Sequence, residues 1–109
     1  MIIETKQDIE IREKILESME EVSGVPREYF EFYRSKKPVE VYLRSIYVYL
    51  MYQFTDKTKV EIKELVGLKN HASVIKAIED IETWKKDPEE YKSKYNLFKQ
   101  ILQHYGQKH

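Results

Sequence analysis

The sequence contains no cysteine, which excludes a disulfide framework and a thiolate metal site and makes a reduced, cytoplasmic setting the default expectation. Glycine and proline are also scarce, with three of each among 109 residues. Because these residues mark turns, and because no stretch alternates strictly between apolar and polar residues, the sequence favours helices over strands. A chain of this length builds one hydrophobic core. We therefore expect one all-α domain over residues 1–109, a compact bundle of about six helices.

Apolar runs long enough for a membrane span are absent too. The most apolar stretch is residues 39–54, which is shorter than the roughly 20 residues that a transmembrane helix requires. It also includes the polar residues Glu40, Arg44 and Gln53. The stretch is predicted instead to be a buried central helix that begins at Pro38. The first six residues lack the basic and apolar regions of a signal peptide, and no membrane is expected among the partners.

The chain has no excess charge of either sign, because 19 basic residues balance 19 acidic ones. Taken alone, this neutrality argues against a nucleic-acid-binding protein. The charges are unevenly distributed along the chain, however. Residues 1–33 carry nine acidic and four basic side chains, whereas residues 34–76 carry nine basic and four acidic ones. The basic block is therefore where a contact with nucleic acid is expected.

The N-terminal third contains signals for two helices. Apolar residues at three- and four-residue steps predict a first helix over residues 5–23, which ends at Gly24. Pro26 is suited to the first position of a short second helix, because proline has no backbone N–H to leave unbonded there. The aromatic residues between 29 and 33 would supply the interior of that helix.

A last helix is predicted over residues 88–105, with Asp87 as its cap and Pro88 as its first residue. Its large apolar side chains recur at steps of four and three residues: Tyr91, Tyr95, Phe98, Leu102 and Tyr105. Such a stripe must be buried against another surface. It either folds back onto the core of its own chain, or it pairs with a second copy in a homodimer or with a protein partner.

The basic block also contains a candidate helix-turn-helix. Thr58 and Glu61 have the spacing of a capping box, which predicts the start of a short helix. Gly67 is suited to the left-handed conformation that ends such a helix, and Asn70 can cap the next one. Two helices separated by about three residues predict a helix-turn-helix over residues 58–86.

From Gly67 to Ala77 the chain reads Gly-Leu-Lys-Asn-His-Ala-Ser-Val-Ile-Lys-Ala. This stretch resembles the C-terminal DNA-binding domain, domain IV, of the bacterial replication initiator DnaA. The signature of that family runs roughly Gly-Gly-(Arg/Lys)-Asp-His-(Thr/Ser)-Thr-Val-x-x-Ala. The residues that fit it are Gly67, Lys69, His71, Val74 and Ala77, with Ser73 as a conservative fit. The residues that depart from it are Leu68, Asn70 and Ala72.

The resemblance implies a Trp-repressor-like or DnaA-like fold and sequence-dependent binding of double-stranded DNA, in replication initiation or its regulation. The sequence has no P-loop pattern, so the chain would be a stand-alone homologue without the ATPase of the initiator, of a kind that a phage or another mobile element could encode. His71, His104 and His109 lack the spacing of metal ligands. We expect no metal, cofactor, catalytic residue or enzyme activity.

The resemblance also implies which residues would contact DNA. The base contacts would come from the start of the second helix of the motif: Asn70, His71, Ala72 and Ser73. The phosphate contacts would come from basic residues: Lys36, Lys37, Arg44, Lys57, Lys59, Lys69 and Lys76. An asparagine in place of the family's aspartate would allow pairing with adenine, and an alanine methyl could meet a thymine methyl. The family's minor-groove arginine aligns with Tyr42, so that contact is not carried over.

Two alternatives stay open. Tyr42, Tyr47, Tyr49 and Tyr52 are predicted to pack in or near the core, although aromatic residues can also form a stacking platform for single-stranded bases. The chain could instead be a protein-interaction module that keeps the fold without binding DNA. Its acidic N-terminal helix or its aromatic C-terminal helix would then meet the partner.

Overall fold

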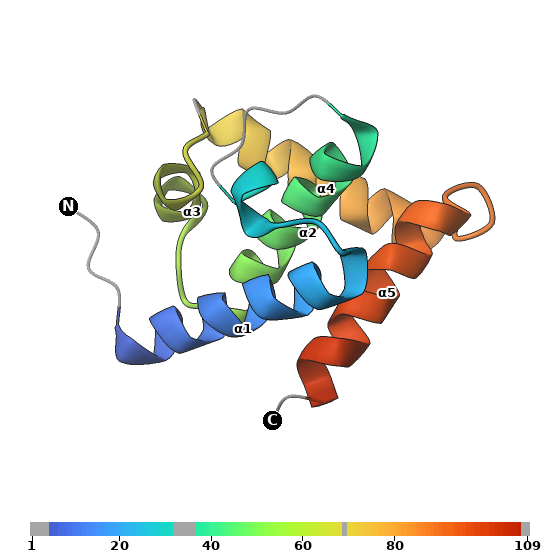
Figure 1. Ribbon diagram of the computed structural model, residues 1–109. Helices are drawn as coiled ribbons and strands as arrows, with labels where there is room; N and C mark the ends of the chain where they lie inside the picture. The colour runs from blue at the N-terminus through green and yellow to red at the C-terminus, as the bar shows by residue number, and fades with distance from the viewer. Residues whose placement is uncertain (1–4, 32–36, 69, 108–109) are drawn as a thin grey trace.

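The computed structural model describes residues 5–31, 37–68 and 70–107. Over these ranges the chain forms helices and no strand, so the all-α prediction is confirmed. Figure 1 shows the five α-helices found there: α1 (Lys6–Ser23), α2 (Pro38–Phe54), α3 (Lys59–Leu65), α4 (His71–Lys86) and α5 (Lys92–Gln107). One turn of 3-10 helix, η1 (Arg27–Tyr29), follows α1.

The prediction of about six helices is wrong by one, because the second helix is only the single turn η1. Pro26 lies before this turn with an extended backbone (φ −60°, ψ 145°) and does not occupy a helical position. The start of the turn is held to α1, because the backbone N–H of Arg27 donates to a carboxylate oxygen of Glu20. The residue after the turn, Phe30, is fully buried, and its ring contacts that of Tyr47 on α2. Part of the aromatic segment, residues 32–33, lies outside the described residues.

The start of α5 also differs from the prediction. Asp87 acts as a cap, since its Oδ1 accepts from the backbone N–H of Glu90 at 3.3 Å. The same residue ends α4, where its backbone N–H donates to the Thr83 carbonyl. Because one residue ends α4 and begins the chain reversal, residues 88–91 form a turn and α5 begins only at Lys92.

The other local signals are found where the sequence predicts them. The predicted helix over residues 5–23 begins one residue later, at Lys6, with Thr5 as its cap, and Gly24 ends it in the left-handed conformation with φ 74°. Thr58 and Glu61 form both hydrogen bonds of a capping box at the start of α3. These contacts satisfy backbone groups that a helix end would otherwise leave unbonded.

The core is built around α2, which packs against α1, α3 and α4. Eight of the 17 residues of α2 are buried, in agreement with the predicted central helix: Glu40, Leu43, Ile46, Tyr47, Val48, Tyr49, Leu50 and Met51. The aromatic stripe of α5 folds back onto this core through Phe98 and Tyr105, which are buried beside Ile101. The first and last helices therefore lie side by side, as Figure 1 shows for α1 and α5.

Arg27 holds η1 against α1 through two glutamates. Its Nη2 lies 2.9 Å from Glu20 Oε1, and its Nη1 lies 2.8 Å from Glu13 Oε2. The hydrogen bond from the Arg27 side chain is the main reason that the pKa of Glu20 is held below its ordinary value. The ionised carboxylate of Glu20 therefore favours the folded state.

The Glu20→Gln variant is expected to lose about 1 kcal/mol of unfolding free energy near pH 7, discounted for the partial exposure of the ion pair. A carboxyl whose folded pKa is lowered stabilises the fold above its unfolded pKa of about 4.3 and loses that effect as the pH falls through the folded value. Urea unfolding of both proteins from pH 7 to pH 3 should show the difference shrinking below about pH 4. A difference that is constant over this range would contradict the assignment.

His104 connects α5 to α1. Its Nε2 lies 2.6 Å from Glu21 Oε2, and its Nδ1 lies 3.0 Å from the hydroxyl of Ser18, which is fully buried. A carboxylate only accepts, so Nε2 donates to Glu21, while Nδ1 shares a hydrogen bond with the Ser18 hydroxyl. The imidazole thereby satisfies a buried hydroxyl as well as joining the two ends of the chain.

The His104→Ala variant is expected to lose about 1–3 kcal/mol of unfolding free energy, because it removes the partner of a buried hydroxyl. His71→Ala is the matched control, since His71 is exposed and its loss should change the free energy by less than about 0.5 kcal/mol. Chemical unfolding at pH 7 measures both. Equal effects of the two substitutions would show that His104 contributes nothing specific.

Candidate nucleic-acid interface

The segment that the sequence predicts as a helix-turn-helix consists of α3, a tight turn and α4. The turn begins where α3 ends, with Gly67 in the left-handed conformation at φ 71°. The backbone N–H of Leu68 donates to the Lys63 carbonyl, and that of Gly67 donates to the Glu64 carbonyl. This pair of hydrogen bonds is the Schellman pattern, which requires a left-handed residue at the position of Gly67. A side chain there would strain the backbone even though open space surrounds the glycine.

The first turn of α4 is exposed on one side and anchored in the core on the other. Asn70, His71 and Ala72 are exposed, and Ser73 is half-buried. On the inner side, Val74 is fully buried and packs in the core with the other inward-facing residues of α4, which are Ala77, Ile81 and Trp84. The predicted base-contact residues therefore lie together on a turn that carries no acidic residue.

Asn70 and Ser73 are engaged with each other at this helix start. Asn70 Oδ1 accepts from the backbone N–H of Ser73 at 3.1 Å and from its hydroxyl at 3.4 Å. Pairing with adenine needs both the oxygen and the nitrogen of the asparagine amide. Because capping uses the oxygen, only Nδ2 is left to donate to a base, and the predicted adenine pair is not compatible with the cap. His71 and Ala72 are then the side chains best placed to meet base edges.

The predicted phosphate contacts differ in their surroundings. Lys36 and Lys69 lie outside the described residues. The side chain of Lys76 is 77% exposed, and its Nζ is 3.4 Å from Asp80 Oδ1. Lys59 Nζ lies 5.6 Å from the centre of the Tyr52 ring, and Lys37 is exposed just before α2. Lys37, Lys59 and Lys76 thus keep ammonium groups at or near the surface, where a phosphate can reach them.

Lys57 and Arg44 are less accessible than the other described residues of the predicted set. The Lys57 side chain is only 5% exposed, and its Nζ lies 3.5 Å from Asp8 Oδ2 of α1. In Arg44 the atoms Nε and Nη2 are buried. The Lys57 ammonium is therefore held by a neighbouring carboxylate, and the Arg44 side chain is only partly open to solvent.

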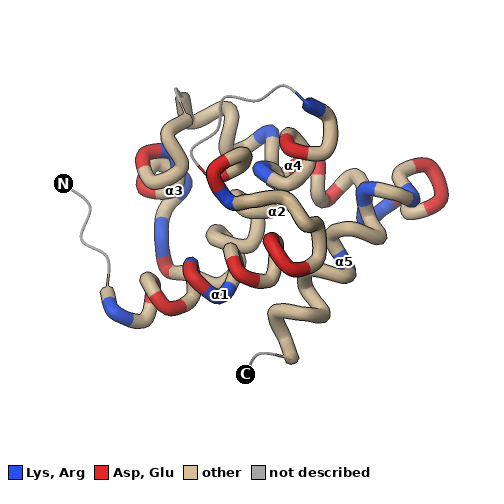
Figure 2. Tube along the Cα trace, viewed as in Figure 1, with Lys and Arg blue, Asp and Glu red and all other residues tan. Residues whose placement is uncertain are grey.

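Acidic residues recur along α1, as Figure 2 shows. The negative charge of the N-terminal third is therefore concentrated on α1. This helix packs mainly against α2 and α5, and much less against α4. The predicted cations that the structure describes lie on several elements, so a DNA contact would depend on a few local cations and the helix start of α4.

No protein-family model and no solved structure matches the chain.

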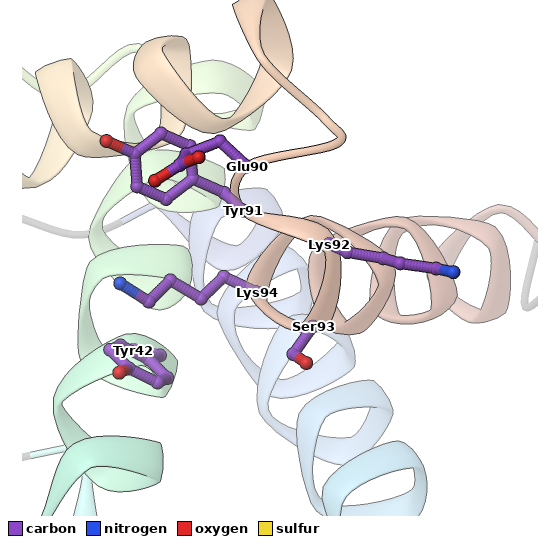
Figure 3. Close-up of a pocket in the computed structure, with 6 residues that line it drawn as sticks. All are labelled: Tyr42, Glu90, Tyr91, Lys92, Ser93 and Lys94. Carbon is purple, nitrogen blue, oxygen red and sulfur yellow. The ribbon is translucent and has the colours of Figure 1, made fainter.

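A second cluster of polar and aromatic residues was not predicted from the sequence. Figure 3 shows the side chain of Lys94 extending from α5 towards Tyr42 of α2. The Lys94 Nζ lies 4.6 Å from the centre of the Tyr42 ring, 5.4 Å from that of Tyr91 and 5.9 Å from that of Trp84. A pocket of about 460 Å³ opens beside this cluster. The cation–π contacts fasten the start of α5 to α2 and α4.

The four tyrosines considered as a stacking platform do not form one. Tyr47 and Tyr49 are buried in the core, and the face of Tyr42 is covered by Lys94. Tyr52 alone of the four is exposed. Bases stack on successive open aromatic faces, so this arrangement fits packing better than binding of single strands.

Across the part of the chain that the structure describes, no three histidine or acidic side chains gather as ligands for a metal ion. Within the same residues, none of the helices combines the length and apolar character needed to cross a membrane.

Proposed function

We propose that the chain binds double-stranded DNA, with α3 and α4 as a helix-turn-helix and the first turn of α4 in the major groove. The observation that carries this proposal is the helix start at Asn70, which is capped, exposed and free of acidic residues while Val74 and Ala77 anchor it in the core. A helix placed in this way can enter a groove without exposing apolar residues. The resemblance to the DNA-binding domain of DnaA supports the same placement, because it covers this stretch.

In this proposal two side chains read the bases. The imidazole of His71 donates to an acceptor on a base edge, and the methyl group of Ala72 contacts a thymine methyl. Lys37, Lys59 and Lys76 hold phosphates on either side and fix the orientation of the helix. The sequence preference then differs from that of the initiator family, since Asn70 keeps its oxygen in the cap. Replication initiation or its regulation is the process that the resemblance suggests.

Two substitutions test the phosphate contacts and the recognition of bases separately. Lys76→Gln is expected to weaken binding by a similar factor on every duplex and to reduce the slope of log affinity against log salt by about one. His71→Ala is expected to reduce the preference among sequences by about 1–3 kcal/mol while it keeps the salt slope. Fluorescence anisotropy with a preferred duplex, selected from a random library, and with a scrambled duplex measures both. If the two substitutions have the same effect, for example if both reduce the salt slope and neither reduces the sequence preference, the assigned roles are wrong.

A further inference from the structure

A groove between α2 and α5 is the feature that the DNA-binding proposal leaves unused. Helix α5 packs mainly against α1 and α4. It contacts α2 through pairs of aromatic side chains. The ring centres of Tyr49 and Phe98 are 5.5 Å apart, and those of Phe54 and Tyr105 are 4.6 Å apart. Beside these rings, an opening of about 380 Å³ is lined by residues of α2 and α5 and by Lys85 of α4.

The groove has a buried apolar floor and a more open rim. The residues that line it are Tyr49, Leu50, Gln53, Phe54, Lys85, Tyr95, Phe98, Lys99 and Leu102. Leu50 is fully buried, Tyr49 and Phe98 are nearly so, and Leu102 at the rim is 36% exposed. Sites for small molecules are typically concave, 300–1,000 Å³ in volume and lined by apolar and aromatic side chains with a few polar groups. The groove has this composition and falls within this range of size.

The charges at the rim are positive. Of the described residues that line the groove, two are lysines and none is acidic. Lys99 Nζ lies 5.1 Å from the centre of the Tyr95 ring. Lys85 Nζ donates to the Tyr49 hydroxyl at 3.2 Å, and that hydroxyl donates to Glu82 Oε1 at 3.0 Å. Glu82, whose carboxylate is 3.9 Å from Lys85 Nζ, offsets one of the two positive charges. One positive charge is left in excess, and it lies beside an apolar floor.

We propose that this groove binds a small organic monoanion with an aromatic or branched apolar body. The body lies on Tyr49, Phe98 and Leu102, and the anionic group is held at the rim by Lys99, with Lys85 on the other side. Apolar burial supplies most of the affinity of such a ligand, and the charge selects an anion over a neutral molecule of the same shape. This site is separate from the first turn of α4, so its test does not depend on DNA binding.

The test uses two dyes that differ in charge. 1-Anilinonaphthalene-8-sulfonate is an aromatic monoanion, and N-phenyl-1-naphthylamine has the same ring system without the sulfonate. Fluorescence titration of the folded protein is expected to give saturable binding of the sulfonate dye at one site per chain. Lys99→Met keeps the apolar stem of the side chain and should weaken the sulfonate dye about threefold to fivefold while leaving the neutral dye unchanged. Leu102→Asn should weaken both dyes.

Lys92→Met is the matched control, because Lys92 is exposed on the same helix but does not line the groove. Its affinity for the sulfonate dye should equal that of the unchanged protein, and thermal unfolding curves should show that every variant is folded. Equal effects of Lys99→Met and Lys92→Met would overturn the proposal. Dye binding that weakens as the protein concentration rises and the chain dimerises would also overturn it, because a second copy would then occupy the groove.

Discussion

The Ala72→Glu variant is expected to lose about tenfold or more of its affinity for duplex DNA while its fold stays intact. Ala72 is exposed in the first turn of α4, so the new carboxylate would face the phosphates and the electronegative base edges. Like charges brought together at an interface cost several kcal/mol, and tenfold corresponds to about 1.4 kcal/mol. The same carboxylate near a helix N-terminus is slightly favourable for the helix itself. Binding and stability should therefore change in opposite directions.

Ala72→Gln is the control for this variant, because glutamine has almost the same size and shape as glutamate without its charge. It should lose much less affinity than Ala72→Glu in the same anisotropy assay, and thermal unfolding should show both variants to be folded, with Ala72→Glu the more stable of the two. If glutamate and glutamine reduce the affinity equally, steric exclusion explains the loss and charge does not. If neither reduces it, the first turn of α4 is not at the interface.

The Ile46→Ala variant is expected to lose about 2–5 kcal/mol of unfolding free energy, the range for truncating a fully buried branched side chain. Ile46 lies on α2 and has no exposed surface. Because α2 contacts three other helices, the neighbouring residues cannot collapse into the cavity without moving those helices. For a domain of this size the loss corresponds to a fall in Tm of roughly 10 °C or more.

Val41→Ala provides the comparison for the core, since Val41 is on the same helix and is exposed. Its unfolding free energy should change by less than about 0.5 kcal/mol. Urea unfolding at pH 7 measures both variants. Similar small effects at the two positions would show that α2 is not the centre of the core.

Features that depend on a few consecutive residues could be predicted from the sequence. The capping box of Thr58 and Glu61, the left-handed Gly67 and the cap at Asn70 each require only neighbours within about four positions. The buried character of α2 follows from its composition. Local hydrogen-bonding rules and apolar periodicity are enough for such features.

Features that depend on distant residues could not be predicted. Lys57 belongs to the basic block in sequence, yet Asp8, 49 positions earlier, holds its ammonium in a buried ion pair. Lys94 covers Tyr42 only because the packing of α5 on α1 and α4 brings the start of α5 near Tyr42 of α2. The dual use of Asp87 at the end of α4 and the start of the following turn likewise depends on how the chain reverses there. Tertiary packing decides these cases, and propensity does not.

The difference between local and distant determinants also decides which parts of the candidate site could be predicted from the sequence. The four predicted base-contact residues are consecutive, so a single helix start brings them together. The predicted phosphate contacts are spread over several elements, and the Lys57 side chain and part of the Arg44 guanidinium are buried. The groove between α2 and α5 combines residues that are up to 53 positions apart, from Tyr49 to Leu102, and no sequence motif marks it.

The most direct test of DNA binding is a titration of the protein with random-sequence duplex DNA at about 50 mM and about 200 mM salt. With three phosphates neutralised, by Lys37, Lys59 and Lys76, the affinity should fall about fortyfold between the two conditions, because counterions are released from the DNA on binding. Ala72→Glu should show little binding even at the lower salt. Absence of any complex of the unchanged protein at the lower salt would contradict the account and favour a protein-interaction module that keeps this fold without DNA.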